Sequence, residues 1–218
     1  MHHNFHREIK KLREKFMTLG GMVEDKIRQA CSVIESRDSD LIEKIINSDY
    51  EIDEMEIEIE EECLKILALH QPVARDLRFI IAVIKINNEI ERIADYAVKI
   101  AKRVDIINRS STLKLALDYR PMADMVIAML KMSLDALVQS DSDLAHRIFV
   151  LDDEVDAFRD KVYKTVKKEM CKQPEHAGSL LNAYLLARHL ERIGDRATNI
   201  AEEVIYMVGG KIVRGEHN

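Results

Sequence analysis

At residues 190–201 the chain reads LERIGDRATNIA, and at residues 90–101 it reads IERIADYAVKIA. Each copy carries two carboxylates four positions apart, Glu191 with Asp195 and Glu91 with Asp95. On an α-helix this spacing puts both carboxylates on one face, about 6 Å apart along the axis. The same acidic pair in the same apolar frame, one hundred residues apart, indicates a duplicated unit with a duplicated site.

The apolar residues around both copies recur at helical spacing. The first seam contains Val83, Ile86, Ile90, Ile93, Ala97, Ile100, Val104 and Ile107, and the second contains Leu186, Leu190, Ile193, Ala197, Ile200, Val204 and Met207. Such heptad-like stripes are typical of left-handed helix bundles. The sequence predicts six helices, at about residues 4–34, 40–70, 73–108, 121–139, from the turn at 140–144 to 171, and 175–208.

The turns between these helices also repeat. Gln71-Pro72 matches Gln173-Pro174, and RDSDL at residues 37–41 matches SDSDL at 140–144. We therefore predict an all-α protein of two tandem three-helix bundles, residues 1–110 and 111–218. Asp38 or Ser39 is expected to cap the helix that follows it, and Gly20-Gly21 to weaken or kink the first helix.

Composition limits the function classes. Apolar residues make up 47% of the 218 residues and aromatic residues only 5%, which favours long helices. The formal net charge of −6 argues against a general nucleic-acid-binding protein. The N-terminus is polar and no apolar run approaches the roughly 18 residues that span a bilayer. Three cysteines without a CxxC pair suit buried thiols in a reducing compartment, so we expect a cytoplasmic protein.

Each half contains a second acidic pair, Asp49 with Asp53 and Asp152 with Asp156. These pairs precede the Gln-Pro turns by about twenty residues, and the Glu-Arg-Ile motifs follow the turns by about the same number. Because antiparallel helices rise equally per residue, both pairs in each half should lie at one level. Four facing carboxylates cannot all stay ionised unless a cation joins them, and oxygen ligands suit Mg, Mn, Ca or Fe and accept Zn.

Other interpretations of these carboxylates remain open. An acidic pair on a helix is often a solvated face or the partner of an arginine, and Arg92 and Arg192 lie beside the motifs. Asn199 lies one turn after Asp195 and could add a ligand or support one, whereas the first half has Lys99 there, so the two sites can differ. Gly194 gives room either for a metal cluster or for close helix packing.

Two further features concern binding and catalysis. Arg75 and Arg78 open the helix at 73–108, where the helix dipole does not favour positive charge, so they are candidates for contact with an anion or a partner. The sequence contains no nucleophile beside a base, no glycine-rich phosphate loop and no Glu-x-x-His motif of ferritin-like bundles.

The four acidic pairs, together with QPVARDLR at residues 71–78 and ERIGD at 191–195, closely resemble the PhoU family of phosphate-uptake regulators. The resemblance covers nearly the whole chain and both repeats. It implies two three-helix bundles that bind metal ions, with iron or zinc expected first and Mg, Mn or Ca as alternatives. The implied metal-binding residues are Asp49, Asp53, Glu91, Asp95, Asp152, Asp156, Glu191, Asp195 and Asn199.

The resemblance also implies a role in the cell. Such a protein is a cytoplasmic homodimer and no enzyme, and it represses the phosphate-starvation response as an adaptor between the ATPase subunit of the phosphate transporter and the sensor histidine kinase. It reaches the membrane only through these partners and binds no nucleic acid. Two alternatives stay open: an accessory protein of a low-affinity phosphate permease, and a carboxylate-bridged metalloenzyme.

Overall fold

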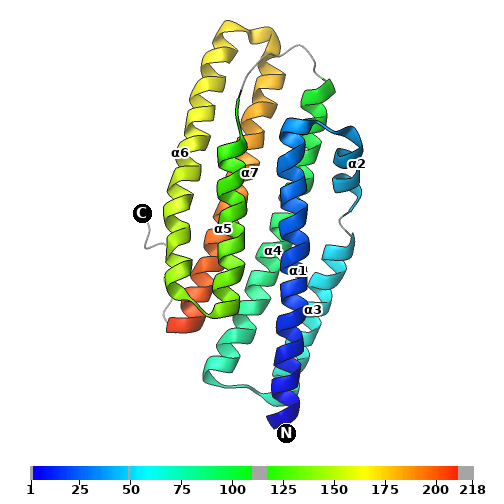
Figure 1. The fold of residues 1–218 in the computed structure, drawn as a ribbon, viewed down its shortest axis with the longest axis vertical. Coiled ribbons are helices and arrows are strands. Elements are labelled where there is room, and N and C mark those ends of the chain that lie inside the picture. Colours follow the sequence, from blue (N-terminus) through cyan, green and yellow to red (C-terminus); the bar gives the residue numbers. More distant parts are fainter. Residues whose placement is uncertain (1, 49, 110–116, 211–218) are drawn as a thin grey trace.

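The computed structural model describes residues 2–48, 50–109 and 117–210, and its regular structure there is entirely helical. The elements are α1 (His2–Ser36), α2 (Ser39–Asn47), α3 (Tyr50–His70), α4 (Ala74–Arg109), α5 (Arg120–Gln139), α6 (Ser142–Lys172), the short 3-10 helix η1 (Pro174–His176) and α7 (Ala177–Gly209). The predicted all-α class is therefore confirmed. Figure 1 shows α1 to α4 on one side of the molecule and α5 to α7 on the other.

The helix predicted at residues 40–70 is wrong in one respect, because the chain breaks it into α2 and α3. At Ser48 the backbone N–H and the hydroxyl both donate to the carbonyl of Ile45, at 3.4 Å and 3.1 Å. A short polar side chain that competes for backbone groups in this way ends a helix. The residue equivalent to Ser48 in the second half is Leu151, which offers no such competition, and α6 is continuous there.

The helix ends repeat between the halves. Asp38 caps α2 and Asp141 caps α6, each accepting hydrogen bonds from the backbone N–H groups two and three residues later. Of the two predicted caps, Asp38 and not Ser39 makes these bonds. Gly210 ends α7 with φ +69°, a left-handed conformation that glycine adopts without strain. The last helix begins at Ala177 rather than near Glu175, because η1 occupies the intervening turn.

One apolar core joins the two repeats. Buried residues of both seams belong to a single cluster, and α4 and α7 pack along each other at its centre while α1 packs on α5. Gly20 does not interrupt α1. A Cβ atom there would lie 3.1 Å from Leu134 Cδ1 of α5, so this glycine permits the close approach of the two repeats.

The boundary predicted between residues 110 and 111 lies outside the described residues and stays a prediction. Cys31 and Cys63 are buried as expected, but Cys171 is exposed near the end of α6, so the expectation of three buried thiols was wrong for that residue. Within the described ranges, every helix is too short or too polar to cross a bilayer.

Candidate metal centres

The second repeat brings its four predicted carboxylates together between α6 and α7. Asp152 has a strongly raised pKa. Burial first, and then the charges of Asp195 and Asp156, raise the pKa of its carboxyl to about 7. Its Oδ1 atom is buried and has no hydrogen-bond partner among the described residues. Glu191 is only 4% exposed, and burial raises the pKa of its carboxyl as well. The prediction that antiparallel helices place these groups at one level agrees with this arrangement.

Gly194 makes room for this cluster. A Cβ atom at residue 194 would lie 3.3 Å from Asp152 Oδ1 and 3.4 Å from Met129 Cε. The close-packing interpretation of this glycine therefore applies, since it lets Met129 of α5 and a carboxylate oxygen of α6 approach α7, and the metal-cluster interpretation stays a prediction. The first repeat has Ala94 at the matching position, which is buried.

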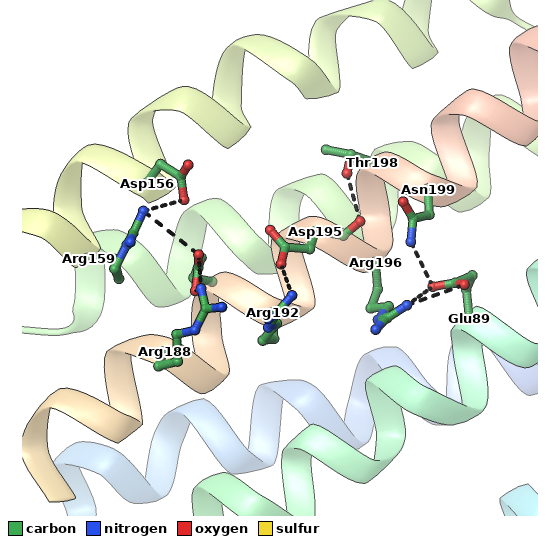
Figure 2. Close-up of polar contacts among 10 residues, drawn as sticks. Glu89, Asp156, Arg159, Arg188, Arg192, Asp195, Arg196, Thr198 and Asn199 are labelled. Atoms are coloured by element: carbon green, nitrogen blue, oxygen red, sulfur yellow. Dashed lines mark hydrogen bonds and ion pairs between the residues drawn. The ribbon is translucent and has the colours of Figure 1, made fainter. Parts of the chain in front are cut away.

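Arginines partner the carboxylates of the second repeat (Figure 2). Arg159 contacts Asp156 at 3.3 Å and Glu191 at 3.8 Å, Arg188 forms a close ion pair with Glu191, and Arg192 pairs with Asp195 at 2.9 Å. The sequence had indicated Arg192 for this role. Arg159 and Arg188 were missed, although each lies three positions from its carboxylate, a spacing that places ion pairs on one helix face.

Asn199 turns away from the second-repeat carboxylates. Its Nδ2 atom donates to Glu89 of α4 at 3.2 Å, and Arg196 reaches the same carboxylate at 3.1 Å (Figure 2). In this conformation Asn199 connects the two repeats and is not positioned as a ligand beside Asp195. Glu89 was not singled out from the sequence, because a contact between helices more than one hundred residues apart has no local signal.

The first repeat assembles a related cluster between α3 and α4. Burial first, then the charges of Asp95, Asp53 and Glu56, raise the pKa of Glu91. Glu56 was missed because it lies in an acidic run whose members look alike in sequence. Lys99 pairs with Asp95 at 3.2 Å, which is the predicted difference between the repeats. Asp49, the remaining predicted residue, lies outside the described residues.

The donor chemistry of both clusters suits a hard or borderline cation. Carboxylates from two helices converge in each repeat, and Asp152 presents a buried oxygen without a partner. Across the described ranges, however, no three His, Cys, Asp or Glu side chains are already arranged as a coordination shell. In the second repeat, Arg159, Arg188 and Arg192 pair with carboxylate oxygens that a cation would otherwise use, and in the first repeat Lys99 does the same at Asp95.

Comparisons with known proteins assign the family. The model of the PhoU domain matches twice, at residues 16–104 and 119–204. The chain is 33% identical to the phosphate-specific transport system accessory protein PhoU homolog of Clostridium acetobutylicum, covering 96% of both chains. It is 35% identical to the phosphate-specific transport system accessory protein PhoU of Escherichia coli K12, covering 96% of this chain and 87% of that protein.

Solved structures agree with this assignment. The crystal structure of PhoU from Pseudomonas aeruginosa superposes with a TM-score of 0.91 at 35% identity, covering 95% of this chain and 100% of that one. The phosphate transport system regulatory protein PhoU from Streptococcus pneumoniae gives a TM-score of 0.88 at 28% identity, covering 96% and 99%. From its two domain matches and these full-length similarities, the chain belongs to the PhoU domain family.

Proposed function

We propose that this chain is an accessory protein of a phosphate-specific transport system and a negative regulator of the phosphate-starvation response. The observation that carries the proposal is similarity along the whole length, because relatives named as phosphate-specific transport system accessory proteins are covered at 82–96% of their own length. The chain acts as a binding module with no catalytic role.

In this role the chain is an adaptor. It contacts the ATPase subunit of the transporter and the sensor histidine kinase at the cytoplasmic face of the membrane, as a homodimer that reaches the membrane only through these proteins. The long rigid helices suit such a role, since they present extended faces that change little on binding.

Deletion of the gene in its native host tests the regulatory role. Expression of a phosphate-responsive reporter should rise in phosphate-rich medium and return to its basal level when the gene is supplied again. An unchanged reporter would contradict the proposal. If the reporter is unchanged while low-affinity phosphate uptake falls, the chain serves a low-affinity permease instead. Co-purification of the ATPase subunit and the kinase with the tagged chain from membranes tests the adaptor contacts.

The metal-binding part of the proposal concerns the two carboxylate clusters. Asp152, Asp156, Glu191 and Asp195 hold a cation in the second repeat, and Asp53, Glu91 and Asp95, with Asp49, hold one in the first. The cation joins neighbouring helices by neutralising their carboxylates. For this to happen Arg159 and Arg188 must leave Glu191, which is feasible because their side chains are partly exposed, by 24% and 30%.

Elemental analysis of purified variants tests these clusters. Combining Asp152→Asn with Asp195→Asn keeps the side-chain shapes and removes two charges, so bound iron or zinc should fall by the share of the second repeat. The matched control is Glu154→Gln, an exposed carboxylate on the same helix. Unchanged metal content in the double variant, or an equal loss in the control, would refute the assignment.

A further inference from the structure

A pocket of about 500 Å³ lies where α1, the start of α4, the end of α7 and the turn after α5 meet. Its polar lining is His6, Arg13, Arg75, Asp76 and Ser140, and its apolar lining includes Phe79 and Met207. Arg75 lies sixteen residues before Glu91 on α4, or about 24 Å along the helix. Met207 lies twelve residues after Asp195 on α7, or about 18 Å along that helix, so the pocket is separate from both carboxylate clusters.

The guanidinium groups of Arg13 and Arg75 both line this pocket. The Arg13 guanidinium lies over the Phe79 ring, 3.9 Å from the ring centroid, which fixes its position. Burial and then the charge of Arg75 lower the pKa of Arg13, while Asp76 acts in the opposite direction. Within residues 2–48, 50–109 and 117–210, neither Arg13 nor Arg75 has a hydrogen bond or ion pair. Asp76 offsets less of this pKa shift than Arg75 causes, so the two like charges still cost free energy, and a bound anion would lower that cost.

Arg78, the other arginine indicated by the sequence, already has a structural role. Its Nε atom donates to the carbonyl of Met207 at 3.2 Å, so it holds the end of α7 against α4. This contact holds Met207 in the lining of the pocket. The end of one repeat thus completes a basic pocket that begins in the other.

We propose that this pocket binds a small organic phosphate, with Arg13 and Arg75 on the phosphate oxygens and Phe79 and Met207 beside the organic part. The planar fork of a guanidinium matches a phosphate group bidentately. A volume of about 500 Å³ falls within the range of sites for small organic molecules. A bare phosphate ion would use the arginines and leave the apolar wall in contact with water.

Calorimetric titration of the full chain with AMP, ADP and ATP tests the proposal, with inorganic phosphate and sulfate in separate titrations. The protein is first dialysed against a chelator, so that phosphate cannot report on bound metal. We expect saturable binding of at least one nucleotide, weakened at least tenfold by Arg13→Gln combined with Arg75→Gln. Arg7→Gln, which removes an exposed charge on α1 outside the pocket, should leave binding unchanged.

Several results would overturn the proposal. The proposal fails if no nucleotide binds, or if inorganic phosphate binds as tightly as every nucleotide. It also fails if the double variant and Arg7→Gln lose the same amount of nucleotide affinity. Arg75→Lys keeps the charge and the fold, so it should bind more weakly than the original chain and more tightly than Arg75→Gln. Equal affinity of the two Arg75 variants would also contradict the proposed contact. These outcomes leave the regulatory role untouched, because the reporter experiment does not depend on this pocket.

Discussion

At Asp152, burial and the like charges of its neighbours raise the pKa of the carboxyl together. Its carboxyl has a pKa of about 7 in the folded chain, against an ordinary value of 3.8. The folded, metal-free chain therefore keeps a proton that the unfolded chain releases near pH 4. A raised carboxyl pKa contributes stability that is fully present below the unfolded pKa and is lost as pH rises through the folded pKa.

The raised pKa of Asp152 predicts how the stability of the metal-free chain changes with pH. In chelator-treated protein, the free energy of unfolding of the original chain should be lower at pH 8 than at pH 5. After allowance for solvent screening, this decrease should exceed that of the Asp152→Asn variant by on the order of 1–2 kcal/mol. Urea unfolding of both proteins at the two pH values measures it. Parallel pH profiles for the two proteins would show that Asp152 is not responsible.

Bound metal should reverse this dependence of stability on pH. A cation binds the deprotonated carboxylate, so the stabilisation by iron or zinc should increase from pH 5 to pH 8 in the original chain. The same titration in Asp152→Asn should give little stabilisation from the second repeat. Melting temperatures with and without a fixed excess of metal measure the effect, and an equal gain at both pH values would contradict it.

At the scale of the element, the capping residues determine where the helices begin. Asp38 accepts hydrogen bonds from the N–H groups of Asp40 and Leu41, at 3.0 Å and 3.2 Å, whereas Ser39 makes no capping bond in this structure. Asp38→Ala should therefore lower the free energy of unfolding by about 1 kcal/mol, and Ser39→Ala by less than about 0.5 kcal/mol. Chemical denaturation of both variants measures the difference. A larger loss of stability in Ser39→Ala than in Asp38→Ala would show that Asp38 is not the capping residue.

The break between α2 and α3 is also an effect at the scale of the element. The helical periodicity of residues 40–70 continues across Ser48, so the pattern of apolar residues alone predicts one helix. The break instead depends on whether a serine side chain bonds to the preceding turn or points to solvent. This choice is local, but the hydrophobic pattern does not record it.

At the scale of the whole molecule, polar contacts between α4 and α7 connect the repeats. Glu89 lies between Arg196 and Asn199, and Lys85 pairs with Glu203 at 2.9 Å. The side chains of Glu89 and Arg196 are 16% and 21% exposed, so removing one partner leaves a poorly solvated charge.

We predict that Glu89→Ala lowers the free energy of unfolding by about 2 kcal/mol. Adding Arg196→Ala should cost less than the sum of the single changes, with a coupling energy above about 0.5 kcal/mol. Urea unfolding of the two single variants and the double variant completes this cycle. Strict additivity would mean that the contact contributes nothing to the packing of one repeat on the other.

The sequence by itself determined the duplication, the all-α class and nearly all helix ends. These features follow from local chemistry: the period of an α-helix, the geometry of proline and glycine, and capping by aspartate. It also indicated that Asp152 and Asp195 come together, because the rise per residue is the same in both helices of a hairpin. Identical spacing around the Gln-Pro turns was enough for that inference.

Only the tertiary structure decided which partner each polar side chain takes. Asn199 bonds to Glu89 in the other repeat, Arg159 and Arg188 reach Glu191, and Arg13 meets Arg75 across two helices. Several partners lie within the reach of each of these long side chains. The choice among them depends on how neighbouring helices are rotated and how closely they approach, which is set by the packing of the shared core and not by the spacing of residues along one helix.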